Sequence, residues 1–159
     1  MPSLEPPDPC LLDPTNLQNR MSAASQIAKL VSEIYPVADP NFLLGTLGDL
    51  TFVVSERGGK RIRGVVSVSW HPPLQEPPVN SGWINVLAVS PSAREKGIGC
   101  QLASRAVQTM IGQGLDAIGL ASAPTSEQFW HNRGFRRCEP QPPDAHCMNP
   151  VMYKFLKKG

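Results

Sequence analysis

The 159-residue sequence has no long apolar run, no closely spaced cysteine pair and little net charge. No apolar stretch approaches the roughly 20 residues of a membrane-spanning helix, so we expect no membrane association. The start, MPSLEPPDPC, has neither a basic nor an apolar segment, so we expect no signal peptide there. The four cysteines (Cys10, Cys100, Cys138 and Cys147) form no CxxC motif, so we expect free thiols in a reducing cytoplasm, and neither a metal site nor a disulfide framework. A net charge of +2 does not by itself indicate a nucleic-acid partner.

Proline is plentiful, and most of the 17 prolines fall within residues 1–20, 71–80 and 139–150. We interpret these stretches as loops or tails, because proline removes a backbone donor and breaks helices and sheets. The length suits one domain. We therefore expect a loosely docked, proline-rich extension over residues 1–19 and a single domain over residues 20–159.

Between these stretches, the spacing of apolar residues predicts alternating helices and strands. A glycine pair, Gly58–Gly59, predicts a hairpin between the first two strands. The expected elements are a helix (20–35), three strands (50–55, 62–70 and 83–89), a helix (97–112), a strand (117–121), a helix (125–132) and two strands (135–138 and 151–156). This order predicts an α/β or α+β domain with a mixed sheet.

The segment VLAVSPSAREKGIG places two glycines behind basic residues, where a strand ends and a helix begins. First-turn amides of a helix lack internal acceptors, and the helix dipole favours negative charge there. Gly97 and Gly99 let an anion approach the backbone closely, while Arg94 and Lys96 add positive charge. A GxxxxGK[ST] loop and the third glycine of GxGxxG are both absent. The pattern predicts a phosphate or pyrophosphate site.

This RxxGxG pattern behind an apolar strand resembles the acetyl-CoA-binding motif of the GCN5-related N-acetyltransferases (GNAT). Further along, FWHNRGF at residues 129–135 resembles the family's FYxxxGF segment, and residues 151–154 resemble its last strand. The resemblance covers roughly residues 50–156. It implies a mixed, mostly antiparallel central sheet flanked by helices, and an acetyl-CoA-dependent transfer of an acetyl group to a primary amine of a small molecule or protein.

The resemblance also implies which residues bind acetyl-CoA. The pantetheine arm would fit in the gap between strands 83–89 and 117–121 and pair with the backbone of residues 87–89. The Leu87 amide would donate to the thioester oxygen and stabilise the oxyanion. The pyrophosphate would contact the amides of residues 96–100. We interpret Cys100 otherwise as a small packed residue. The expected cofactor-binding residues are Leu87, Ala88, Val89, Arg94, Glu95, Lys96, Gly97, Ile98, Gly99, Cys100 and Trp130.

Two proton-transfer positions depart from the family's pattern. Trp130 replaces the tyrosine that often acts as the acid, and an indole N–H is not an acid at neutral pH. Asn85 stands where a glutamate base is often found, and an amide cannot take up the proton. Candidate catalytic side chains are instead Glu127 and His131 in the last helix and Tyr153 in the last strand. Further candidate bases lie in or beside proline-rich loops, namely His71, Glu76 and His146.

Two other functions stay open from the sequence. The departures at Trp130 and Asn85 also fit an acyl-CoA-binding sensor or regulatory module with little turnover. Acetylation of charged tRNA would need a basic face, and the low net charge disfavours it. The one dense basic cluster in the sequence comprises Arg133, Arg136 and Arg137, with Lys154, Lys157 and Lys158 as further members. The sequence does not specify the amine acceptor, and it neither supports nor excludes the homodimer that is common in the family.

Overall fold

A computed structural model of the protein describes residues 10–11, 17–34, 47–55, 61–74, 77, 79–94, 97–142 and 149–156. Its elements follow the predicted order and add a short first strand and two 3-10 turns. In chain order they are β1 (Cys10–Leu11), α1 (Leu17–Ile34), β2 (Leu50–Ser55), β3 (Ile62–Ser69), β4 (Ser81–Val89), η1 (Pro91–Ala93), α3 (Ile98–Gly112), β5 (Ala117–Ala121), η2 (Pro124–Ser126), α4 (Glu127–Asn132), β6 (Arg136–Arg137) and β7 (Val151–Phe155).

The strands form one seven-stranded sheet in the order β1-β2-β3-β4-β5-β7-β6. The pairing of β4 with β5 is parallel. The pairings of β1 with β2, β2 with β3, β5 with β7 and β6 with β7 are antiparallel. The expected mixed, mostly antiparallel sheet is therefore confirmed.

The chain divides into two compact units, one of residues 1–68 and 86–106 and the other of residues 69–85 and 107–159. Strand β4 and helix α3 each contribute residues to both. Within the predicted extension, Cys10 and Leu11 pair with Val53 and Phe52 of β2, so this part of the extension adds a strand to the sheet. The division into an extension at 1–19 and a domain at 20–159 stays a prediction.

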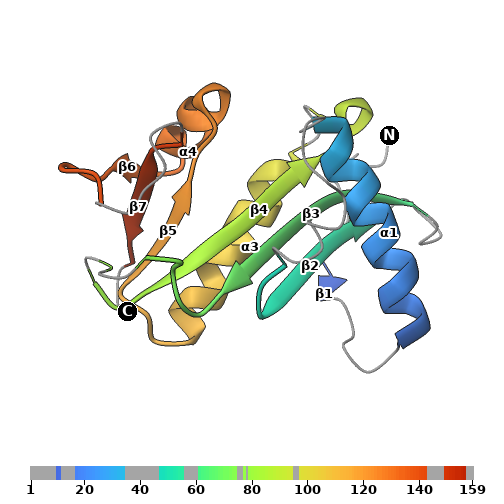
Figure 1. Ribbon diagram of the computed structural model, residues 1–159, viewed down its shortest axis with the longest axis horizontal. Helices are drawn as coiled ribbons and strands as arrows, with labels where there is room; N and C mark the ends of the chain where they lie inside the picture. The colour runs from blue at the N-terminus through green and yellow to red at the C-terminus, as the bar shows by residue number, and fades with distance from the viewer. Residues whose placement is uncertain are drawn as a thin grey trace, which may run out of the picture. The chain divides into compact units, whose positions relative to one another are not determined.

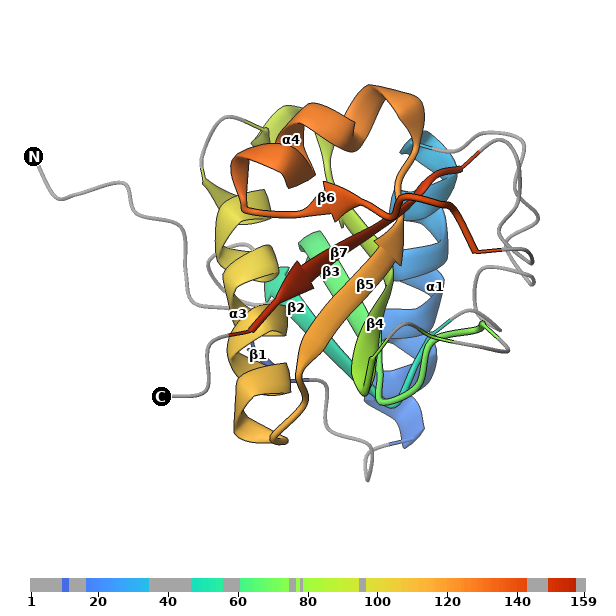
Figure 2. The same cartoon turned by 90° about the vertical axis from the view of Figure 1, so that its left-hand side faces the viewer.

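In the first unit, α1 and the start of α3 cover opposite faces of the strands, as Figure 2 shows. On the face of α1, apolar side chains from the helix and three strands form one buried cluster, which contains Ile27, Leu30, Val31, Val53, Ile62, Val65 and Ala88. On the other face, a Cβ added at Gly64 of β3 would lie 2.8 Å from Ile98 Cγ2 and 2.9 Å from Leu102 Cδ1. The first turns of α3 therefore pack directly on the backbone of β3.

In the second unit, β5 lies between β4 and β7, as Figure 1 shows. Trp83 of β4 and Tyr153 of β7 meet edge to face, with ring centroids 6.4 Å apart. Their rings cover Gly119 of β5, where an added Cβ would lie 2.7 Å from Tyr153 Cζ and 3.0 Å from Trp83 Cζ3. A side chain at residue 119 would thus displace two buried rings.

Several predicted boundaries shift in the structure. The helix expected at 20–35 begins earlier, at Leu17. The helix expected at 125–132 begins as the 3-10 turn η2, with Pro124 at its start, and becomes α-helical only at Glu127. The strand expected at 135–138 shortens to β6, because the amide of Phe135 closes the turn after α4 by donating to the Trp130 carbonyl at 3.1 Å. The predicted Gly58–Gly59 turn lies outside the described residues.

Candidate functional site

The predicted anion site lies at the start of α3. Gly97 has a φ of +77°, which glycine adopts without steric cost. Its carbonyl accepts the helical hydrogen bond of the Gln101 amide at 3.1 Å. Gly97 is therefore the N-cap, and the amides of Ile98, Gly99 and Cys100 lie in the first turn, where no helical acceptor exists. Residues 95 and 96 lie outside the described residues, so the roles expected for Glu95 and Lys96 stay predictions.

The side chains at this helix start divide into buried and exposed groups. Ile98 is buried on Gly64, Gly99 is half-buried, and Arg94 and Cys100 are exposed. The expectation that Cys100 is packed is wrong, because Cys100 is two residues after Ile98. Residues two positions apart in a helix are separated by about 200° around its axis, so the Cys100 thiol lies away from the buried side of Ile98. The side chains of Arg94 and Cys100 are therefore accessible at this helix start.

The connection from β4 to α3 is fastened to β3 through the short turn η1. The amide of Ser90 donates to the Arg63 carbonyl at 2.7 Å, and the amide of Ala93 donates to the Ser90 carbonyl at 2.9 Å. The guanidinium of Arg63 donates from Nη1 to Ser92 Oγ at 2.7 Å, and the hydroxyls of Ser90 and Ser92 lie 3.1 Å apart. Ser90 and Ala93 are both buried, so packing holds the turn in addition to these hydrogen bonds.

The backbone expected to bind the pantetheine arm belongs to the end of β4. The parallel register with β5 runs from Ser81 opposite Ala117 to Ile84 opposite Leu120. The residues Leu87, Ala88 and Val89 follow this paired stretch; Ala88 is buried and the other two are half-buried. Their roles as backbone partners, and the role of Leu87 as oxyanion donor, stay predictions.

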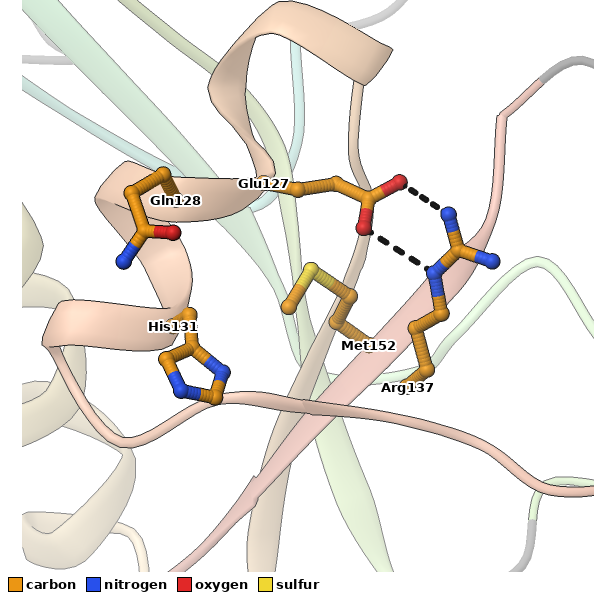
Figure 3. A pocket seen from close by; sticks show the side chains of 5 residues that line it. All are labelled: Glu127, Gln128, His131, Arg137 and Met152. Carbon is orange, nitrogen blue, oxygen red and sulfur yellow. Dashed lines mark hydrogen bonds and ion pairs between the residues drawn. The ribbon is translucent and has the colours of Figure 1, made fainter.

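A pocket of about 310 Å³ in the second unit is lined by Glu127, Gln128, His131, Arg137 and Met152 (Figure 3). Arg137 donates from Nε to Glu127 Oε2 at 2.9 Å and from Nη2 to Glu127 Oε1, so both carboxylate oxygens are engaged. These hydrogen bonds from Arg137 lower the pKa of Glu127. A carboxylate held in its charged form is a weak proton acceptor, which counts against Glu127 as the base.

The other two catalytic candidates have different surroundings. His131 lies one helical turn after Glu127, is exposed and lines the same pocket. Tyr153 is only 4% exposed, and its hydroxyl lies 3.3 Å from the Ser81 hydroxyl. Burial raises the pKa of Tyr153. The structure therefore brings Glu127 and His131 together and places Tyr153 in the buried cluster with Trp83.

The positions where the family's usual proton-transfer residues are replaced have structural contacts. Trp130 is 6% exposed. Its ring meets Phe129 and Phe135 edge to face, at centroid distances of 4.9 and 5.2 Å. Asn85 donates from Nδ2 to Ser69 Oγ at 3.0 Å. His71 is exposed, whereas Glu76 and His146 lie outside the described residues.

The basic cluster is held by intramolecular contacts where the structure describes it. The guanidinium carbon of Arg133 lies 4.1 Å from the centroid of the Phe129 ring. Arg136 donates from Nη1 to the His131 and Phe135 carbonyls, and Lys154 donates from Nζ to the Arg133 carbonyl. These bonds engage carbonyls at and after the end of α4, and the Glu127–Arg137 ion pair ties the start of α4 to β6.

Three further observations concern metal binding, membrane spans and the thiol of Cys138. Within the described ranges, no group of three or more His, Cys, Asp and Glu residues could hold a metal ion. None of the helices there combines the length and the hydropathy of a membrane span. Cys138 is a half-buried free thiol, and burial raises its pKa.

A family model described as the acetyltransferase (GNAT) family matches residues 24–135. The chain belongs to the GNAT acetyltransferase family. This membership confirms the resemblance carried by the two sequence motifs and the expected enzyme class, an acetyltransferase. Among curated proteins, none matches the sequence significantly.

Solved structures support the GNAT fold at low sequence identity. Tetrahymena GCN5 superposes with a TM-score of 0.77 at 14% identity, over 96% of this chain and 98% of that one. A GNAT-family acetyltransferase of Staphylococcus aureus Mu50 gives 0.69 at 17% identity, over 94% and 99%. N-acetylglutamate synthase of Neisseria gonorrhoeae, in complex with coenzyme A and N-acetyl-glutamate, gives 0.64 at 15% identity, over 95% and 36%.

Sequence reasoning about this GNAT domain missed the partners of several site residues. It placed Arg137 only in a basic cluster, although the structure pairs it with Glu127. It also gave no role to Arg63 and Ser92, which are 29 residues apart. The acidic first turn of α4 and the basic residues after it were the only signal for the first pair, and the second pair has no local signal.

Proposed function

We propose that this GNAT domain binds acetyl-CoA at the β4–α3 connection and transfers the acetyl group to a primary amine of a small molecule or protein. The observation that carries the proposal is the capped start of α3 at Gly97, behind Arg94, in a chain of an acetyltransferase family. Three first-turn amides and a nearby guanidinium suit a pyrophosphate. A structural relative bound to coenzyme A supports the same ligand.

The chemistry that this proposal requires comes largely from main-chain groups. The amides of residues 98–100 would bind the pyrophosphate, and backbone at Leu87–Val89 would align the pantetheine arm. An amide at Leu87 would stabilise the tetrahedral oxyanion, a contribution typically worth about 3–4 kcal/mol in other acyl transferases. Holding thioester and amine together supplies much of the remaining acceleration. The neutral amine then attacks the thioester carbonyl to form a C–N bond. The C–S bond of the tetrahedral intermediate breaks, coenzyme A leaves as its thiolate, and the nitrogen releases one proton, which solvent can return to the thiolate.

Titration calorimetry with acetyl-CoA tests the binding step. Arg94→Glu replaces an exposed cation at the helix start by an anion, and we expect it to weaken binding by about tenfold or more, since loss of a charged contact and added repulsion each cost roughly 1 kcal/mol. Lys29→Glu makes the same charge change at an exposed position of α1 and should leave the affinity nearly unchanged.

The turnover step is tested by following free coenzyme A thiol with a panel of small amines and of peptides bearing α-amino or lysine amines. Acceleration by one class of amine identifies the acceptor. A folded wild-type protein that binds no acetyl-CoA would refute the proposal. Equal weakening by Arg94→Glu and Lys29→Glu would refute the assigned site, because the effect would then follow net charge alone.

A second candidate is a domain that binds an acyl-CoA as a sensor with little turnover. The ion pair of Glu127 with Arg137 favours this alternative, because it holds one candidate base as a weakly basic carboxylate. The burial of Trp130 at the position of the usual acid favours it as well. Tight acetyl-CoA binding without acceleration by any amine would select the sensor over the enzyme.

A further inference from the structure

Two consecutive residues of β3, Arg63 and Gly64, contact both ends of the connection that leads into α3. Arg63 bonds the turn η1 before the connection: its carbonyl accepts from the Ser90 amide and its guanidinium donates to the Ser92 hydroxyl, both at 2.7 Å. Gly64 leaves the space into which Ile98 packs after the connection. The turn η1 and the start of α3, which flank residues 95 and 96, are therefore both in contact with the same strand.

Of these contacts, the side-chain hydrogen bond from Arg63 to Ser92 is the one that a substitution can remove. The main-chain bond from Ser90 to the Arg63 carbonyl does not depend on side-chain identity. The packing of Ile98 on residue 64 requires glycine there. The Ser90 and Ser92 hydroxyls lie 3.1 Å apart, so the Arg63 guanidinium also orients a hydroxyl pair inside the turn. Loss of the Arg63–Ser92 bond would leave the main-chain bond from the Ser90 amide to the Arg63 carbonyl in place.

We propose that Arg63 is a positioning residue for acetyl-CoA binding, which acts through Ser92 by fixing the turn η1 and thereby the backbone leading to the first-turn amides of α3. This inference rests on the proposed function. Pyrophosphate recognition by main-chain amides requires those amides to be prearranged, since each hydrogen bond has a narrow range of distance and angle. Arg63 itself does not contact the ligand in this scheme.

The test is a double-mutant cycle on the dissociation constant of acetyl-CoA, measured by calorimetry for wild type, Arg63→Ala, Ser92→Ala and the double variant. Each single change should weaken binding by about threefold to tenfold, the equivalent of one lost hydrogen bond. The double variant should bind no more weakly than the weaker single variant, because both changes remove the same bond.

Control variants separate positioning from charge and from folding. Arg61→Ala removes the same charge from an exposed residue two positions earlier and should bind like wild type. Arg63→Lys keeps a donor and should recover part of the affinity. The melting temperature of the ligand-free Ser92→Ala protein should stay close to that of wild type, because Ser92 is exposed. A general loss of structure would instead lower it together with the affinity.

The outcomes distinguish this inference from the function on which it rests. No binding of acetyl-CoA by folded wild type would overturn both. Normal binding by wild type together with unchanged binding by Arg63→Ala and Ser92→Ala would overturn only the positioning role. Additive losses in the double variant would show that Arg63 does not act through Ser92. An equal loss in Arg61→Ala would show that the effect follows charge.

Discussion

Replacing Gly119 by alanine is expected to destabilise the protein by forcing a methyl group between two buried rings. The added Cβ would lie 2.7 Å from Tyr153 Cζ and 3.0 Å from Trp83 Cζ3. Ordinary van der Waals contact begins at 3.4 Å, so the tyrosine ring must move by 3.4 − 2.7 = 0.7 Å and the indole by 3.4 − 3.0 = 0.4 Å. Both rings are nearly fully buried, at 4% and 6% exposure, and have little room to move.

The expected magnitude follows from two opposing contributions. Overpacking of this kind typically costs about 1–3 kcal/mol. Alanine is favoured over glycine inside a strand by about 0.5–1 kcal/mol, which offsets part of that cost. The net loss in the free energy of unfolding should be about 1–2 kcal/mol, or a fall in melting temperature of about 2–8 °C for a chain of this length.

Urea unfolding followed by circular dichroism measures the effect as a lower midpoint at unchanged slope. Gly112→Ala is the matched control: an added Cβ there meets nothing within 4 Å, so the variant should be as stable as wild type or up to about 1 kcal/mol more stable. In a Tyr153→Leu background, which removes the two nearest ring atoms, Gly119→Ala should cost less. A Gly119→Ala protein that is at least as stable as wild type would refute the reasoning.

Two further predictions concern titratable groups. In a pH titration followed by carboxyl NMR, the Arg137→Gln variant should return the lowered pKa of Glu127 toward the ordinary glutamate value; an unchanged titration would contradict the ion pair. Because folding lowers this pKa, the pair stabilises the fold at neutral pH, and its contribution disappears as the pH falls through the lowered pKa. Iodoacetamide should modify exposed Cys100 faster than Cys138, whose thiol is half-buried and has a raised pKa, and peptide mass spectrometry would detect equal rates as a failure.

The elements that the sequence predicted best are those with clear boundaries. The bounds expected for β2 and β5 agree with the structure, since each is an apolar run that ends at polar or turn-forming residues. The buried face of α3 follows the apolar spacing of the sequence, because Leu102, Ala106 and Met110 recur every four residues and are all buried. Strand β1 was missed because two residues within a proline-rich stretch show no period, and only their pairing with β2 makes them a strand.

The candidate site was predictable only where its chemistry lies in the backbone. A glycine N-cap behind a strand is a local pattern, so the start of α3 could be found from a few adjacent letters. Side-chain pairing in the folded chain joins residues that are distant in sequence. The bond from Arg63 to Ser92 spans 29 residues, and the bond from Glu127 to Arg137 spans 10. No local spacing rule encodes such contacts.

This difference between backbone and side-chain chemistry also explains how the family's usual acid and base positions can change while the fold persists. An amide at a helix start or at a strand end is present whatever side chain the residue carries, so ligand binding and oxyanion stabilisation tolerate substitution. Proton transfer depends on one side chain, and at residue 130 an indole packed between Phe129 and Phe135 has replaced the usual phenol. The indole contributes buried aromatic area there and no transferable proton. A transferase built this way would depend on solvent, or on a group such as the exposed His131, for its proton transfers, whereas a sensor would need neither.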